Sequence, residues 1–265
     1  MNLFAKAVFS AAIIGAALTG CGDDKAKELK VGAIAGPEAQ IAQEAAKVAK
    51  EKYGLDVKIV EFSDYATPNV ALNDGSIDLN AFQHKPYLDQ QIKDRGFKIV
   101  PVGNTFVYPI AAFSKKIKNI SELKDGAQIA VPNDPSNLGR SLLLLAKQGL
   151  ITMKDGAGLN STKLDIATNP HNFNIVELDA AQLTHALDDA DIAIINNTYA
   201  GQANLQVGRD SLFVEDKDSP YVNLIVAREN NKDSDAVKTF VKSYQDDAVY
   251  NKAVELFHGG VVKGW

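Results

Sequence analysis

The chain has 265 residues, of which 46% are hydrophobic, so its length and composition suit one or two domains with a substantial core. Its 33 acidic and 28 basic side chains are mixed along the sequence and leave a net charge of −5, with no basic stripe of the kind that binds nucleic acid. The mean hydropathy of −0.12 argues against an integral membrane protein. We therefore expect a soluble body and no nucleic-acid partner.

The first 20 residues are predicted to be a signal peptide. Lys6 is the only charge before the apolar run 7–19, which is shorter than the roughly 20 residues that a spanning helix needs. The run ends in Leu-Thr-Gly-Cys, which matches the lipobox of bacterial lipoproteins, and Cys21 is the only cysteine of the chain. We expect Cys21 to carry the lipid that anchors the protein in a bilayer. The alternative is an incidental cysteine in a removed leader.

Residues 21–27 are predicted to be a lipidated tether. About seven residues at roughly 3.3 Å each span about 20 Å, so the folded body would lie close to the membrane on its periplasmic side. Gly22 follows the cysteine, in place of the aspartate that acts as an inner-membrane retention signal in enteric bacteria. The choice between the inner and the outer membrane therefore stays open.

Alternating strand and helix patterns begin at residue 29. The strand 29–35 precedes a helix that Pro37 opens and Gly54 ends, and 57–62 is the next strand. A strand, a helix and a strand within about 35 residues predict a parallel βαβ unit. Further elements are expected in chain order, namely the strand 77–82, the helix 85–95 and the strand 98–102.

The apolar segment 107–113 contains Pro109, which a central strand tolerates poorly, so we expect this segment at a sheet edge or at a crossing between two lobes. A second series then begins with the strand 128–131 and the helix 137–148. The remaining expected elements are the strands 174–178, 192–195, 212–214 and 221–227 and a final amphipathic helix with apolar residues at 237, 240, 241 and 244.

Two strand–helix series without a Gly/Ser linker predict an α/β fold of two closely coupled lobes. We expect lobe I to comprise 28–112 and 221–265, and lobe II to comprise 113–220. The irregular strand spacing argues against a TIM barrel. Open α/β sheets bind ligands where the carboxyl ends of their strands meet, which here is the cleft between the lobes.

Motifs of catalysis are missing from the sequence. The mature body has no cysteine nucleophile, no G-x-S-x-G, no P-loop and no G-x-G-x-x-G. Its four histidines have no metal-binding spacing, and acidic pairs such as Asp188-Asp189 suit a solvated surface. We therefore expect a binding protein that is not an enzyme and has no metal or other cofactor.

Phe82, His84 and Tyr87 follow a predicted strand and open a predicted helix, which is where α/β folds place ligand contacts. Together they could present ring faces and polar edges to a ligand. The alternative is that Phe82 and Tyr87 are core aromatics and that His84 is a surface histidine.

Arg140 and Asn137 lie near a predicted helix N-terminus, where free N–H groups and the helix dipole favour an anion. The planar guanidinium of Arg140 could hold a carboxylate by two hydrogen bonds, or it could be a surface group. Asn196 ends one apolar strand and Asn223 interrupts another, and a buried asparagine needs partners from the backbone or from a ligand.

These candidates together describe an amino acid with an uncharged side chain. A thioether among aromatic rings gains about 0.3–1.5 kcal/mol per contact, but this chemistry alone does not choose methionine over leucine or phenylalanine.

Long strings of the chain resemble the methionine-binding lipoproteins of bacterial methionine importers, the NLPA lipoprotein family. The strings are FQHKPYLDQQIKDRGFKIVPVGNTFVYPIAAFSKKI at 82–117, VPNDPSNLGRSLLLL at 131–145, FVEDKDSPYVNLIVARE at 213–229 and GGVVKGW at 259–265. The resemblance runs over nearly the whole chain. It implies a periplasmic-binding-protein fold that carries L-methionine to an inner-membrane ABC permease with its ATPase subunits.

The resemblance also implies roles for single residues, and it leaves Asn197 unassigned. Phe82, His84 and Tyr87 would line the side-chain pocket, with Tyr65 as a further ring. Arg140, assisted by Asn137, would hold the carboxylate, and Asn196 and Asn223 would bind the amino-acid backbone group. Because the family also has a non-transporting member, an envelope lipoprotein with a vestigial or different amino-acid or dipeptide ligand is the alternative.

Overall fold

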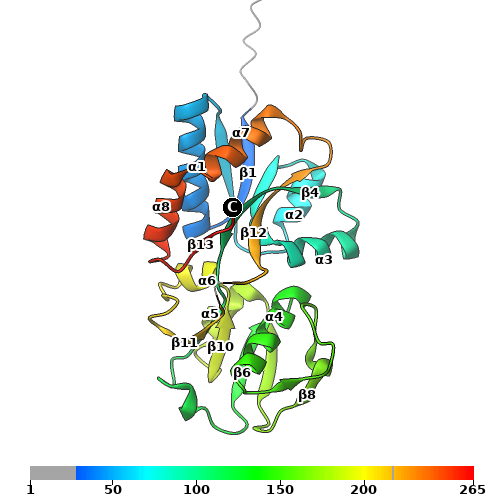
Figure 1. Cartoon of the computed structure of the whole chain (residues 1–265), viewed down its shortest axis with the longest axis vertical. Helices are drawn as coiled ribbons and strands as arrows, with labels where there is room; N and C mark the ends of the chain where they lie inside the picture. The colour runs from blue at the N-terminus through cyan, green and yellow to red at the C-terminus, as the bar shows by residue number, and fades with distance from the viewer. Residues whose placement is uncertain (1–27, 217) are drawn as a thin grey trace, which may run out of the picture.

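The computed structural model describes residues 28–216 and 218–265, so Cys21, the predicted signal peptide and the predicted tether lie outside the described residues. The described chain forms two main sheets with helices packed against them, one above the other along the long axis (Figure 1). The predicted α/β class is confirmed. None of the helices in 28–216 or 218–265 has the length and apolar character needed to cross a membrane.

The first sheet has six strands in the order β13-β4-β12-β3-β1-β2. Its strands are β1 (Leu29–Ile34), β2 (Val57–Phe62), β3 (Leu79–His84), β4 (Ile99–Val107), β12 (Val222–Arg228) and β13 (Val262–Lys263). Its helices are α1 (Pro37–Tyr53), α2 (Pro68–Asp74), α3 (Lys85–Arg95), α7 (Asp235–Tyr244) and α8 (Asp247–Leu256). β1 pairs in parallel with β2 and β3, which confirms the predicted βαβ unit.

The second sheet has five strands in the order β11-β5-β10-β6-β9. They are β5 (Ala111–Phe113), β6 (Gln128–Pro132), β9 (Asn174–Leu178), β10 (Ile192–Ile195) and β11 (Ser211–Val214), beside a small hairpin of β7 (Thr152–Met153) and β8 (Ile166–Thr168). Its helices are α4 (Pro135–Lys147), α5 (Leu183–Ala186) and α6 (Asn197–Gln202).

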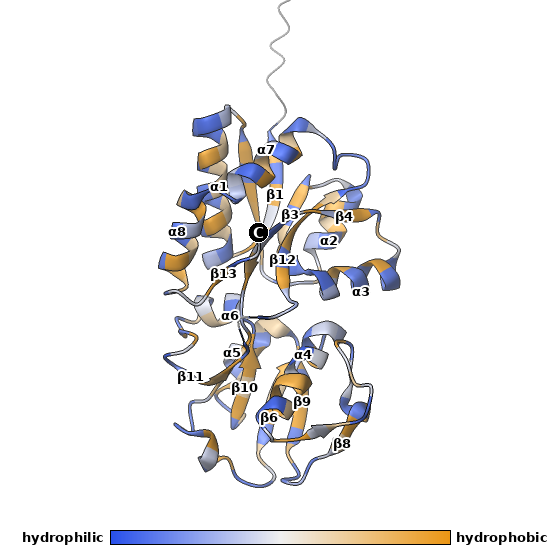
Figure 2. Cartoon of the chain, viewed as in Figure 1, coloured by the Kyte–Doolittle hydropathy of each residue, from blue (hydrophilic) through white to orange (hydrophobic). Residues whose placement is uncertain are grey.

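Each sheet has its own hydrophobic core, because the strands are apolar and the helices turn one apolar face towards them (Figure 2). In the first sheet α1 packs against α7 and α8, with Ile41 and Phe240 fully buried in the same cluster. In the second sheet Leu142 and Leu145 of α4 pack over Ile129. The apolar run in α4 thus faces a core, as its spacing predicts.

The chain crosses between the sheets at two described places. Residues 108–110 lead from β4 to β5, and the segment 215–221, of which 217 is not described, leads from β11 to β12. Glu215 N donates to Ile110 O at 3.0 Å, so the two crossings are hydrogen-bonded to each other. Pro109 therefore lies at a crossing; the sheet-edge alternative is wrong, because β5 lies between β10 and β11.

Some element boundaries differ from the predicted ones. β3 ends at His84, two residues beyond the predicted 77–82, and α4 begins at Pro135 because Asp134 caps it. The helices α2 and α8 were not predicted. α2 is short and buries only three residues. The amphipathic helix was expected to be the last element, but Asp246 caps a further helix directly after it.

Candidate ligand-binding site

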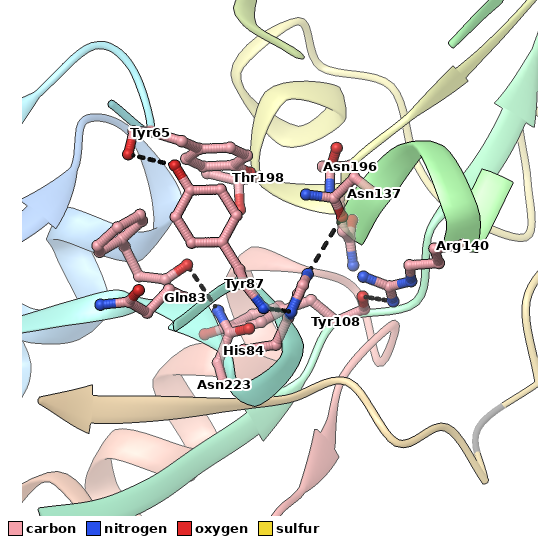
Figure 3. Close-up of a pocket in the computed structure, with 12 residues that line it drawn as sticks. Tyr65, Gln83, His84, Tyr87, Tyr108, Asn137, Arg140, Asn196, Thr198 and Asn223 are labelled. Atoms are coloured by element: carbon pink, nitrogen blue, oxygen red, sulfur yellow. Dashed lines mark hydrogen bonds between the residues drawn. The ribbon is translucent and has the colours of Figure 1, made fainter. Parts of the chain in front are cut away.

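A cavity lies between the two sheets. Its lining includes all eight residues singled out from the sequence, namely Tyr65, Phe82, His84, Tyr87, Asn137, Arg140, Asn196 and Asn223. The other lining residues are Gln83, Tyr108, Asn197 and Thr198. Figure 3 shows side chains converging from β3, α3 and β12 on one side and from α4, α6 and the end of β10 on the other, with Tyr65 and Tyr108 contributed by connecting segments. No cluster of three or more potential metal ligands occurs in 28–216 and 218–265.

Aromatic rings form one wall of the cavity. Tyr65 lies 5.8 Å from Phe82 and 6.1 Å from Tyr87 between ring centroids, and Phe82 and Tyr87 meet edge to face at 6.0 Å. The Tyr87 hydroxyl donates to the Tyr65 carbonyl at 2.7 Å. The three rings therefore hold one another in place and leave an apolar surface for a ligand side chain.

His84 joins the two halves of the cavity through a defined tautomer. Its Nδ1 accepts from Tyr87 N at 3.2 Å and caps α3, so the proton of the neutral ring is on Nε2, which donates to Asn137 Oδ1 at 3.2 Å. Asn196 Nδ2 donates to the same oxygen at 3.0 Å. Burial and then the nearby charge of Arg140 lower the pKa of His84 to about 3, so the ring is neutral at physiological pH.

The N-terminus of α4 already has a carboxylate as its partner. Asp134 accepts from the Asn137 backbone at 3.0 Å and from the Ser136 hydroxyl at 2.9 Å. The expectation that free N–H groups here bind an anionic ligand is therefore corrected, because the capping oxygen belongs to the chain. Burial raises the pKa of this carboxyl group.

Arg140 is 3% exposed and forms an ion pair that was not predicted. Its Nε donates to Glu215 Oε1 at 2.9 Å, and its Nη2 donates to Glu215 Oε2 and, at 3.0 Å, to the Tyr108 carbonyl. The guanidinium carbon lies 4.2 Å from the centroid of the Tyr221 ring. Arg140 is thus a buried residue, and part of its hydrogen-bonding capacity is already used by Glu215 and Tyr108.

The two asparagines differ in how their polar atoms are satisfied. Asn196 Oδ1 is buried and has no hydrogen-bond partner among the described residues. Asn223 Nδ2 donates to the Phe82 carbonyl at 3.0 Å and to Glu38 Oε1 at 3.4 Å. The Tyr108 hydroxyl, also in the cavity lining, is likewise buried without a partner among the described residues. A buried acceptor without a partner is costly, so a ligand donor at Asn196 Oδ1 would be favourable.

Three buried amides support the cavity from behind. Gln83 Nε2 donates to Asn69 Oδ1 at 2.6 Å and to Asn80 Oδ1 at 2.9 Å, and Asn69 Nδ2 returns a bond to Gln83 Oε1 at 2.8 Å. Of these three, Gln83 lines the cavity. The sequence signal for this network is a polar residue inside a strand whose two faces are both buried.

Glu38 and Glu215 were also missed by the sequence reasoning. Glu38 is 1% exposed in the first turn of α1, where an acidic residue ordinarily complements the helix dipole at the surface. Its Oε1 accepts from the Thr198 hydroxyl at 2.8 Å, and Thr198 belongs to α6 on the second sheet. Nothing local in the sequence indicates that this carboxyl group is buried between the two halves.

Two α/β halves joined by two crossings, with a polar and aromatic cavity between them, define a substrate-binding protein of the periplasmic-binding-protein fold. The family model of the NlpA lipoproteins matches residues 29–265, and the chain belongs to this family. It is 64% identical over 259 residues, 96% of both chains, to the D-methionine-binding lipoprotein MetQ of Salmonella typhimurium.

Solved structures agree with this assignment. The chain superimposes on a crystal structure of the methionine-binding protein MetQ with a TM-score of 0.89, at 64% identity, over 90% of this chain and 98% of that one. A nutrient-binding protein from Burkholderia cenocepacia bound to methionine gives a TM-score of 0.87 at 51% identity, over 89% and 100% of the two chains.

Proposed function

We propose that this chain binds L-methionine in the cavity between its lobes and delivers it to an inner-membrane ABC permease with its ATPase subunits. The observation that carries the proposal is a single cavity in which an aromatic wall faces a buried arginine and an unpartnered asparagine oxygen. The relatives named above are named for binding methionine, not for a reaction, which supports a carrier over an enzyme.

The thioether would lie against Tyr65, Phe82 and Tyr87, where sulfur–aromatic contacts contribute about 0.3–1.5 kcal/mol each. The ammonium group would donate to Asn196 Oδ1, with Asn223 beside it. The carboxylate would accept from Arg140 Nη1, because the hydrogen bonds of Arg140 to described residues come from Nε and Nη2. Asn137 and His84 would hold this arrangement through their shared hydrogen bond.

We infer that ligand binding shifts the two lobes towards their closed arrangement, because contacts to both lobes form only when they meet. The lobes would be 28–112 with 221–265, and 113–220. The boundary between 112 and 113 falls inside β5, whose residues all pair in the second sheet. We therefore propose that the first lobe ends within residues 108–110, before β5.

Ligand release and titration test the proposal. Denaturing the purified protein should release methionine at close to one molecule per chain, measured by mass spectrometry. The protein freed of ligand should then bind L-methionine more tightly than L-leucine in calorimetry, since leucine lacks the sulfur contacts. D-methionine is titrated in parallel, because one relative is named for that enantiomer. An empty or dipeptide-loaded cavity, or equal affinity for leucine, would count against methionine.

We also propose that a lipid on Cys21 holds the protein at the periplasmic face of a membrane. β1 begins at the end of the first sheet that is remote from the second sheet, so a tether joined there leaves the cavity unobstructed (Figure 1). The wild-type protein should partition into detergent, and Cys21→Ala protein should not. A wild-type protein that stays in the aqueous phase would rule out the anchor.

A further inference from the structure

Arg140 is oriented by partners from both crossings between the lobes. Glu215 lies in the crossing from β11 to β12, and the Tyr108 carbonyl lies in the crossing from β4 to β5. Glu215 Oε2 also accepts from Ile110 N at 3.4 Å. The guanidinium is therefore held by both crossings, although its helix belongs to the second sheet.

These partners leave one defined edge of the guanidinium for a ligand. Arginine has five N–H donors. Nε donates to Glu215, and Nη2 donates to Glu215 and to Tyr108, which accounts for three. The Tyr221 ring covers one face of the group at 4.2 Å. The two donors on Nη1 remain, and Arg140 borders the cavity.

The charges around the cavity nearly cancel. Glu215 is in direct contact with Arg140 and offsets its positive charge. His84 is neutral, because burial lowers its pKa to about 3, and Glu38 is largely protonated at neutral pH, because burial raises its pKa to about 8. Asp134 faces the positive end of the α4 dipole. A cavity whose charges largely offset one another suits a ligand that carries both an ammonium and a carboxylate group.

We propose that Glu215 is a positioning residue that sets the charge selectivity of the cavity: it orients Arg140 so that only Nη1 meets the ligand, and it offsets the arginine charge so that a zwitterion is preferred over an anion. The inference rests on the proposed binding of methionine and assigns a role to a residue outside the cavity lining. Without the Glu215 charge, an uncompensated arginine would attract any carboxylate, with or without an amino group.

The test compares Glu215→Gln with Asp216→Asn. Both variants remove one negative charge from the same crossing, but Asp216 pairs with Lys147 at the surface, with 66% of its side chain exposed. Calorimetry measures the Kd for L-methionine and for 4-(methylthio)butanoate, which is methionine without its amino group. In Glu215→Gln we expect the Kd for 4-(methylthio)butanoate divided by the Kd for L-methionine to fall by about tenfold or more. In Asp216→Asn the ratio should stay within about twofold of the wild type.

The outcomes separate this inference from the proposed function. If the wild type binds no methionine, the proposed function fails; if it binds methionine and Glu215→Gln keeps the wild-type ratio, only the role of Glu215 fails. Should Glu215→Gln not fold, Glu215→Asp keeps the charge, and we expect weaker binding of both ligands with an unchanged ratio; a changed ratio overturns the inference. If neither variant folds, equal affinity of the wild type for both ligands overturns it, and a preference for methionine of about a hundredfold supports it.

Discussion

Arg140→Ala is expected to weaken methionine binding by about 10- to 150-fold, because the carboxylate loses charge-assisted hydrogen bonds worth about 1.5–3 kcal/mol. The 3% exposure of Arg140 means that water cannot easily take over its role. Calorimetric titration of the variant and the wild type measures the loss. Arg209→Ala is the control, since Arg209 is 63% exposed and pairs with the adjacent Asp210. Binding as tight as in the wild type would show that the carboxylate lies elsewhere.

The same variant is also expected to be less stable. Removal of Arg140 leaves the Glu215 carboxylate, with a 14% exposed side chain, and the Tyr108 carbonyl without their donor. Breaking a buried ion pair from one side costs about 3–5 kcal/mol, and the partial exposure of Glu215 places the expected loss at the lower end. Urea denaturation measures the free energy of unfolding.

A double variant separates the two effects of Arg140. In Arg140→Ala/Glu215→Gln the uncompensated charge is gone, so the free energy of unfolding should recover by about 1–2 kcal/mol relative to Arg140→Ala. Methionine binding should stay weak, because the guanidinium is still absent. If binding recovered together with stability, the loss in the single variant would reflect damaged folding and not a missing ligand contact.

Glu38→Gln is expected to remove a pH dependence of stability. Burial raises the pKa of Glu38 from 4.5 to about 8, with the Thr198 hydroxyl opposing this only in part. Below pH 4.5 the group is protonated in both states. Between pH 4.5 and about 8 the unfolded chain releases this proton and the folded chain keeps it. The free energy of unfolding therefore falls by up to about 1.4 kcal/mol for each unit by which the pH rises.

The comparison is made by urea denaturation at pH 5, 6, 7 and 8. The advantage of Glu38→Gln over the wild type should grow with pH across this range, because the amide keeps the oxygen that Thr198 and Asn223 use and never ionises. His84 acts in the opposite sense, since its pKa is lowered from 6.5 to about 3 and its contribution is lost as the pH falls, but both proteins contain it. Glu51→Gln on the exposed side of α1 is the matched control and should show no such trend. If the free energy of unfolding depends on pH in the same way in Glu38→Gln and the wild type, the raised pKa of the buried Glu38 is contradicted.

Local patterns predicted most of the fold. The helix 85–95 and the strands 57–62, 174–178 and 192–195 have the predicted bounds, because short-range periodicity, Pro and Gly set them. Where a cap decided the boundary, as Asp134 does for α4, the pattern was off by two residues. The helix α8 was not predicted because it begins directly after α7, where Asp246 caps its first turn.

By itself the sequence determined the α/β class, the family resemblance and the eight residues that were expected to line a binding site. Local strand and helix patterns indicated seven of these residues, because such patterns place polar and aromatic side chains at a predictable edge of a sheet. Tyr65 was implied only by the family resemblance. Their meeting in one cavity was decided by the two crossings, which bring both sheets to the same place.

The tertiary structure alone decided which charges surround that cavity. Glu215 meets Arg140 across 75 positions of the chain, and Glu38 meets Thr198 across 160. Neither acidic residue has a local pattern that distinguishes it from a solvated surface group, because burial of a charge depends on what packs over it and not on its neighbours in the sequence. The charge balance that suits a zwitterion is therefore a property of the folded protein.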